Sequence, residues 1–300
     1  MSRRIGQTAP VTAGATAETT TARWVVLFGA VVCGTTGTAV QWLVPDAAPL
    51  SAGAMRLAVG ALTLVVTAGI AGQRWLHFRG HRRWLLAGGV AVAAYQGCFF
   101  TGTTRAGVAL GTVVALGSAP MFSGLIDAVL FRRVPSRRWM AGTLLAVVGV
   151  ALIAGNRPSG AVDAVGVLAA LGAGLGWATY AKIGQQRMGL GLHSTASMAG
   201  MFVVGAVLSL PLLAAVDSGW VLTRAGAALS LYLGVITIGV VYTSFGWGLR
   251  KLSAPSVVTL TLAEPMTAAV LSVVVLHQPM PLIGWVGVVT VLLALMLSAG

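Results

Sequence analysis

Ten apolar runs, each long enough to cross a lipid bilayer, follow one another along the sequence. A spanning helix needs about 20 apolar residues, because each residue adds about 1.5 Å across a hydrocarbon core about 30 Å thick. Only 8% of the 300 residues are charged and the mean hydropathy is +0.91, whereas soluble domains carry about 25% charged residues. We therefore predict an all-α membrane protein with ten transmembrane helices over residues 24–43, 48–71, 84–104, 106–131, 138–155, 162–183, 194–215, 225–248, 252–276 and 281–299.

The basic residues fall mainly in alternate gaps between these runs. Cytoplasmic loops carry an excess of Lys and Arg. With the N-terminus placed inside, only Arg105, Arg157 and Arg224 fall in outside segments. This pattern predicts a multi-pass protein of the cell membrane with both termini in the cytoplasm. The fifteen residues of the inside segments are Arg3, Arg4, Arg23, Arg74, Arg79, Arg82, Arg83, Arg132, Arg133, Arg137, Arg138, Lys182, Arg187, Arg250 and Lys251.

Several function classes are excluded by composition. The net charge of +13 does not indicate nucleic-acid binding, because the basic residues form no patch on a soluble face. Cys33 and Cys98 lie inside apolar runs and are interpreted as small buried hydrophobic residues, and the four histidines lack metal-ligand spacing. No GxxxxGK[ST] loop occurs. We expect no cofactor, no metal and no direct use of ATP.

The two halves of the sequence match each other at a constant shift of 145 residues. Pro120-Met121 falls on Pro265-Met266, Arg105 on Arg250, and Gly89 on Gly234. Each half holds five predicted helices, and five is odd, so the second half enters the membrane from the opposite side. This arrangement is an inverted-topology repeat, which typically builds a central site near the bilayer midplane.

The repeat, Arg56 early in the second run and the Ala263-Glu264-Pro265 triplet together resemble the EamA family of the drug/metabolite transporter superfamily. The resemblance implies a first five-helix repeat over 23–155 and a second, inverted repeat over 156–300. Residues 1–22 are rich in Thr, Ala and Gly and are predicted to form a disordered cytoplasmic tail. Family members often end their fourth and ninth spans with a Gly-Glu pair. This chain has Phe131-Arg132-Arg133 and Leu276-His277-Gln278 there, so no role of those glutamates is carried over.

Apart from Arg138, Asp163 and Lys182 at the span ends, three acidic or basic residues lie within the predicted spans. A charge at the bilayer centre costs about 2.5–3.5 kcal/mol on insertion scales, so each one needs a reason. Glu264, near the middle of its span, is predicted to bind a proton or the substrate, with a structural tie between helices as the alternative. Arg56 is interpreted as an anion anchor, a partner of Glu264 or a structural residue. Asp127 is interpreted as an interfacial carboxylate held by Arg132 and Arg133.

The remaining candidates are prolines and polar or aromatic residues of the span middles. Pro120 and Pro265 occupy matching places in the two halves and are predicted hinges, because proline removes a backbone donor and frees a carbonyl one turn earlier. A largely apolar pocket uses a few such side chains to orient its ligand. The candidates for its wall are Thr35, Thr36, Tyr95, Gln96, Trp177, Tyr180 and Tyr242.

These observations favour a secondary transporter that moves small organic solutes by alternating access, with export as the expected direction. Either an ion gradient, with a proton as the candidate ion, or the solute gradient itself would drive it. Two alternatives stay open: a membrane-embedded enzyme that modifies a lipid, and a membrane scaffold that transports nothing. Neither paired carboxylates nor a histidine cluster supports the enzyme. The partners expected are the solute and the lipid bilayer, and the sequence leaves open whether the chain forms a homodimer.

Overall fold

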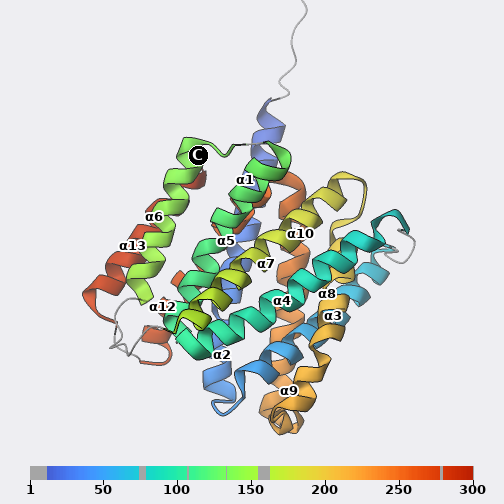
Figure 1. The fold of residues 1–300 in the computed structure, drawn as a ribbon, viewed down its shortest axis with the longest axis vertical. Helices are drawn as coiled ribbons and strands as arrows, with labels where there is room; N and C mark the ends of the chain where they lie inside the picture. The colour runs from blue at the N-terminus through green and yellow to red at the C-terminus, as the bar shows by residue number, and fades with distance from the viewer. Residues whose placement is uncertain are drawn as a thin grey trace, which may run out of the picture.

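The computed structural model describes residues 12–73, 79–106, 108–132, 134–154, 163–277 and 280–299. Over these residues every regular element is a helix, and α7 lies in the middle of the bundle (Figure 1). The elements are α1 (Thr12–Gly34), α2 (Thr36–Leu43), α3 (Pro49–Ile70), η2 (Arg79–His81), α4 (Arg82–Ala106), α5 (Val108–Phe131), α6 (Arg137–Ala154), α7 (Ala164–Gly189), α8 (Ser194–Ala215), η3 (Gly219–Leu222), α9 (Arg224–Leu231), the π-helix η4 (Tyr232–Val240), α10 (Val241–Lys251), α11 (Ala254–Leu260), α12 (Ala263–Val274) and α13 (Leu282–Ala299).

The outer surface of this bundle suits lipid rather than water. Large apolar side chains face outward, among them Ile70, which is 84% exposed, and Leu130, which is 68% exposed. Such a surface would be an aggregation hazard in water, but lipid tails solvate it. The protein is therefore a multi-pass membrane protein. Six helical stretches are long and apolar enough to cross a bilayer, and they are Glu18–Leu43, Leu50–Ile70, Ala164–Gly189, Ser194–Ala215, Arg224–Lys251 and Ala254–Leu271; Val114–Leu130 and Leu282–Ala294 are shorter apolar helices.

Three of the long stretches are interrupted. α1 ends at Gly34 before α2 begins, the π-helix η4 separates α9 from α10, and a turn at Thr261 and Leu262 separates α11 from α12. The last break has a clear cause. Pro265 has no backbone N–H to donate to the Thr261 carbonyl, which instead accepts the N–H of Glu264 at 2.9 Å. The helix is therefore interrupted beside Pro265, and the Thr261 carbonyl, which was expected to be free, accepts a hydrogen bond.

Glycines let the helices approach closely. A Cβ at Gly89 of α4 would collide with Val204 of α8, and a Cβ at Gly234 of η4 would collide with Val59 of α3. Small residues at helix contacts provide this close packing in membranes, where there is no hydrophobic force between helices. Both contacts belong to the halves' mutual interface, since α3 and α4 come from the first half and η4 and α8 from the second.

The N-terminal end of α1 and the C-terminal end of α13 lie at the same end of the bundle (Figure 1). Glu18, near the start of α1, forms an ion pair with Lys251 at the end of α10. Arg138, at the start of α6, donates a hydrogen bond to the Leu297 carbonyl near the end of α13 at 3.1 Å. At the opposite end, Arg105 of α4 pairs with Asp163, which caps α7, at 2.9 Å.

The predicted disordered tail is too long. Helix α1 begins at Thr12, so residues 12–22 are helical, and only residues 1–11 of the predicted tail lie outside the described part of the chain. Residues 12–22 contain no proline and are rich in alanine, the best helix former. Glu18 is also tied to Lys251, which fixes this part of α1 to the bundle.

Candidate functional site

Glu264 lies in the first turn of α12, directly after the break that follows α11. Its side chain lines a small cavity together with Trp177, Tyr242, Thr261 and Cys33. The cavity volume is about 20 Å³, which admits about one water molecule and no organic solute. Among the described residues, no Lys or Arg nitrogen lies within 4.0 Å of the carboxylate. The carboxylate is therefore not held as one half of an ion pair in this conformation.

The position of Glu264 depends on a close contact between α1 and α12. A Cβ at Gly34 would lie 2.7 Å from the Glu264 carbonyl oxygen and 2.6 Å from Thr267 Cβ. Only glycine therefore allows the end of α1 to pack directly on the first turn of α12. Because α1 ends at this glycine and α11 ends just before Thr261, two interrupted helices meet beside the carboxylate. Backbone irregularity of this kind is tolerated at membrane depth where it lines a cavity.

Arg56 contacts the π-helix rather than Glu264. Its Nε donates to Thr237 Oγ1 at 3.0 Å, and one terminal nitrogen donates to the Thr237 carbonyl at 3.5 Å. The same terminal nitrogen lies 3.6 Å from Cys33 Sγ, and the thiol in turn donates to the Thr237 carbonyl at 3.5 Å. Arg56 and Cys33 therefore both hydrogen-bond to Thr237. No Arg56–Glu264 ion pair forms within 4.0 Å.

Four of the predicted cavity residues cluster with Arg56 around a second small cavity. Tyr95, Gln96, Tyr180 and Tyr242 line it with Arg56, and its volume is about 10 Å³. The Tyr180 and Tyr242 hydroxyls lie 3.3 Å apart, and Tyr242 also lines the Glu264 cavity. Gln96 donates to the Gly53 carbonyl at 3.3 Å, so it also ties α4 to α3. A shared wall at Tyr242 separates the two cavities.

The remaining candidates lie at different distances from this centre. Trp177 lines the Glu264 cavity, and its ring lies 5.9 Å from that of Tyr95 between centroids, with the two ring planes tilted by 50°. Thr35 lies at the α1–α2 break, where its hydroxyl contacts the Tyr232 hydroxyl and donates to the Val32 carbonyl at 2.6 Å. Thr36 Oγ1 is buried and has no hydrogen-bond partner in the described part of the chain. Neither threonine lines the two central cavities.

The two predicted hinges differ. Pro265 is buried at the start of α12, where the helix is broken. Pro120 is also buried, but it lies inside α5, which runs without interruption from Val108 to Phe131. The matching prolines therefore have unequal effects on the backbone in this conformation.

A much larger hollow opens at the end of the bundle where α1 begins and α13 ends. It has a volume of about 810 Å³ and is lined by the ends of α5, α7, α10 and α11 and by residues 134–136 and Trp139. We call it the vestibule. In contrast to the central cavities, the vestibule is large enough for a metabolite, because ligand pockets measure about 300–1,000 Å³.

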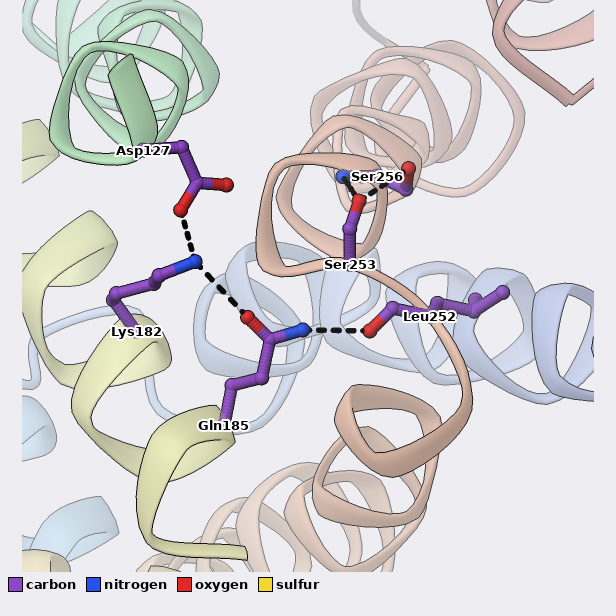
Figure 2. A network of polar contacts seen from close by, with 6 residues as sticks. All are labelled: Asp127, Lys182, Gln185, Leu252, Ser253 and Ser256. Carbon is purple, nitrogen blue, oxygen red and sulfur yellow. Dashed lines mark hydrogen bonds and ion pairs between the residues drawn. The ribbon is translucent and has the colours of Figure 1, made fainter. Parts of the chain in front are cut away.

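A charged network forms part of the vestibule wall (Figure 2). Asp127 of α5 forms an ion pair with Lys182 of α7, and both residues are more than nine-tenths buried. Lys182 Nζ donates to Gln185 Oε1 at 3.2 Å, and Gln185 Nε2 donates to the Leu252 carbonyl at 2.8 Å. The sequence did not predict this partner: Lys182 pairs with the Asp127 carboxylate, Arg132 forms no ion pair with it within 4.0 Å, and Arg133 lies outside the described residues.

Sequence reasoning missed Lys182, Thr237, Tyr232 and the bonded role of Cys33. Lys182 was counted among the basic residues of a cytoplasmic segment, whereas α7 continues to Gly189 and buries it. One signal was available: Lys182, Gln185, Gln186 and Gly189 follow helical spacing of three and four residues, which marks one polar face. For Thr237 and Tyr232 no local pattern distinguishes them, because the π-helix brings them inward.

Both halves of the chain match the same protein family. The EamA-like transporter family model matches residues 21–155 and again residues 164–300. A relative from Bacillus subtilis (strain 168), named uncharacterized transporter YwfM, is 37% identical over 274 residues, which cover 90% of this chain and 91% of the relative. A second, named probable terminal-alkyne amino-acid exporter, comes from Streptantibioticus cattleyicolor and is 30% identical over 233 residues, which cover 76% of each chain.

A solved crystal structure has the same fold. It superposes with a TM-score of 0.79 and 19% sequence identity, over 93% of this chain and 96% of the other. The family match spans nearly the whole chain, and apolar helices surround a polar centre. The chain therefore belongs to the EamA-like transporter family and is a membrane solute transporter.

Proposed function

We propose that the chain crosses the membrane ten times as two inverted five-helix repeats, 23–155 and 156–300, and moves small organic solutes by alternating access. Contacts related by the 145-residue shift support the repeat. Gly89 packs on Val204 and Gly234 packs on Val59. Gly234 lies 145 positions after Gly89, and Val204 lies 145 positions after Val59, so the shift relates the two contacts to each other. Such reciprocal contacts are expected when a two-fold axis relates the halves.

The backbone conformation at two helix ends supports the same relation. Arg132 follows α5 with φ 52°, and His277 follows α12 with φ 54°. These are the only non-glycine residues of the described chain with positive φ, and they lie 145 positions apart. A residue in the left-handed region commonly ends a helix. The two halves therefore end their fourth helices in the same way, although the local sequences differ.

Both termini belong on the cytoplasmic side in this proposal. The vestibule end of the bundle carries Arg83, Arg187 and Arg250 among its basic residues, whereas Arg105 and Arg224 lie toward the other end. This asymmetry supports the orientation, since cytoplasmic loops are enriched in Lys and Arg. The vestibule then opens to the cytoplasm, where an exporter takes up its solute. The name of the Streptantibioticus relative supports export as the direction.

Glu264 is proposed as the carboxylate that takes up and releases a proton during transport. The observation that carries this role is its location: it lines a small cavity at a break between two helices and, among the described residues, has no cationic partner within 4.0 Å. A carboxylate in such a site is stable only when protonated or newly partnered. When the cavity opens to one side of the membrane, the Glu264 carboxylate meets the water on that side. It can then exchange a proton with that side only.

Comparison of cells that produce the wild-type chain with cells that produce Glu264→Ala tests this function. The proposal predicts that at least one class of small solute falls inside and rises outside only in the wild-type cells, at equal protein levels. Lipid extracts from the same cells provide the control for the rival enzyme. A modified lipid together with an unchanged solute distribution would contradict transport as the primary activity.

A further inference from the structure

Two arginines from different helices lie against one tryptophan ring. Trp84 is in the first turn of α4, and the guanidinium carbon of Arg83 lies 5.6 Å from the centroid of its ring. The guanidinium carbon of Arg187, in the last turn of α7, lies 4.8 Å from the same centroid. Both contacts are within cation–π range, about 6 Å. One indole ring therefore holds two like charges close together, and we call Arg83 and Arg187 the arginine pair.

The acidic side chains of the chain do not compensate the arginine pair. The chain has six acidic residues, all within the described ranges, and they are Glu18, Asp46, Asp127, Asp163, Asp217 and Glu264. None of them has an oxygen within 4.0 Å of a side-chain nitrogen of Arg83 or Arg187. Glu18 and Asp127 are already paired with lysines. The positive charge of the pair is therefore left without a carboxylate partner from these side chains.

The surroundings of the pair also favour an anion. The Nε atom of Arg187 is buried and has no hydrogen-bond partner in the part of the chain that the structure describes, and an unmade hydrogen bond is costly on a charged group. The first turn of α4 holds Arg82 and Arg83 and no acidic residue, although the N-terminal end of a helix dipole favours negative charge. An anion beside the pair would offset both unfavourable features and the repulsion between the two guanidinium groups.

An apolar, lipid-facing surface continues along α4 from the arginine pair. Leu86 and Val90 follow Arg83 at spacings of three and seven residues, so all three lie on one face of the helix. Leu86 is 46% exposed and Val90 is 55% exposed, and Arg83 is exposed as well. A ligand with an anionic head and an apolar chain matches this face along its length. Free phosphate matches only its charged end.

We propose that Arg83 and Arg187 bind the phosphate of an anionic lipid headgroup, with an acyl chain of that lipid lying along Leu86 and Val90. Guanidinium groups suit this ligand, because their N–H groups can donate in pairs to phosphate oxygens. Basic groups between transmembrane helices on the cytoplasmic side commonly bind lipid headgroups. The arginine pair joins α4 of the first half to α7 of the second half, so the bound lipid would bridge the two halves. Lipid binding here requires neither solute transport nor Glu264.

Native mass spectrometry of the purified full chain in a non-ionic detergent measures the affinity for the first bound lipid. The anionic probe is dioleoylphosphatidylglycerol. Dioleoylphosphatidylcholine has the same acyl chains and no net charge, so it isolates the contribution of the headgroup charge. We expect the wild-type chain to bind the anionic lipid roughly 10-fold or more tightly than the neutral one, because its phosphate hydrogen-bonds to charged groups.

Two variants show whether the arginine pair is responsible for this preference. Arg83→Gln with Arg187→Gln should abolish it. Arg83→Gln alone should weaken it, and this change leaves the packing intact because Arg83 is exposed. The matched control is Arg132→Gln with Arg137→Gln, which also removes two exposed arginines, beside vestibule residues 134–136. It should keep the preference.

Three results with these lipids would overturn the proposal: equal affinity of the wild-type chain for both lipids, an unchanged preference in Arg83→Gln with Arg187→Gln, or an equal loss of preference in the control. Inorganic phosphate tests the other source of the same chemistry. We expect equimolar inorganic phosphate to leave the anionic lipid bound, because it lacks the acyl chain that contacts Leu86 and Val90. Displacement of the lipid by equimolar phosphate would assign the site to free phosphate and contradict a lipid site.

Discussion

Glu264 and Arg56, the two ionisable residues near the centre of the bundle, have different surroundings. Arg56 is satisfied by the Thr237 hydroxyl and carbonyl. Glu264 faces a cavity with room for about one water molecule. Both residues could be selected from the sequence, because charges inside apolar runs are rare and costly. The sequence could not show that Arg56 and Glu264 are unpaired, because this depends on the π-helix η4, which turns Thr237 toward Arg56.

Replacement of Glu264 by Gln separates a proton-carrying role from a structural tie. Gln is nearly isosteric and can hydrogen-bond, but it cannot titrate. We expect Glu264→Gln to accumulate in the membrane normally, to lose gradient-driven transport and its pH dependence, and to keep solute-for-solute exchange. The measurement is transport by the purified variant in vesicles with and without a pH gradient. Wild-type pH dependence in this variant would leave Glu264 as a structural tie.

At the scale of single elements, the α11–α12 break is the feature most directly tied to the site. Pro265→Ala supplies an N–H that can compete with that of Glu264 for the Thr261 carbonyl, which favours a continuous helix. We expect this change to slow transport while protein level and solute binding persist. Pro120→Ala should have the smaller effect, because α5 is already continuous. Equal transport rates in wild type and both variants would remove proline from the mechanism.

The ends of α5 and α12 allow a prediction about stability. Arg132 and His277 occupy the left-handed region, which costs a non-glycine residue about 1 kcal/mol or more. Arg132→Gly and His277→Gly should therefore each raise the unfolding temperature in detergent. Val275→Gly is the matched control, since Val275 lies two residues before His277 and its φ is −99°, and it should lower that temperature. Destabilisation by all three changes would contradict the assigned backbone conformation.

Helix ends and breaks were the least predictable elements. Hydrophobic runs locate a span but do not show where its backbone departs from α-helical geometry. The Pro265 break was anticipated because proline acts through its own missing donor. The π-helix at 232–240 carries no such signal: its residues are YLGVITIGV, and the same run fits an ordinary spanning helix. Burial of Lys182 likewise follows from where α7 ends, which composition leaves uncertain by about 2–4 residues.

For the whole molecule, the orientation in the membrane is a direct prediction. Ser218 lies in the segment between α8 and η3, and Ser136 lies between α5 and α6 at the vestibule end. With Cys33 kept and Cys98 replaced by Ser, a cysteine at 218 should react with a membrane-impermeant thiol reagent in intact cells, and one at 136 should not. After the cells are opened, both should react. Labelling at 136 but not at 218 in intact cells would reverse the orientation.

The family and its fold could be anticipated from the sequence because the pattern that specifies them is long-range and redundant. Ten apolar runs, alternating basic gaps and a constant 145-residue register all indicate the same arrangement. The closed centre and the open vestibule could not be anticipated. They depend on where the helices break and on how they pack together, which hydrophobic runs alone do not specify.

Reactivity of a cysteine at the centre, probed from each side of the membrane, tests alternating access most directly. Ala30 lines the Glu264 cavity and is 3% exposed. In a Cys33→Ser, Cys98→Ser background, which removes the native thiol from the same cavity, Ala30→Cys should react with an impermeant reagent added to right-side-out vesicles and also to inside-out vesicles. The reagent itself should not cross the membrane. Reactivity from one side only, under every solute and pH gradient applied, would contradict a centre that opens alternately to both sides.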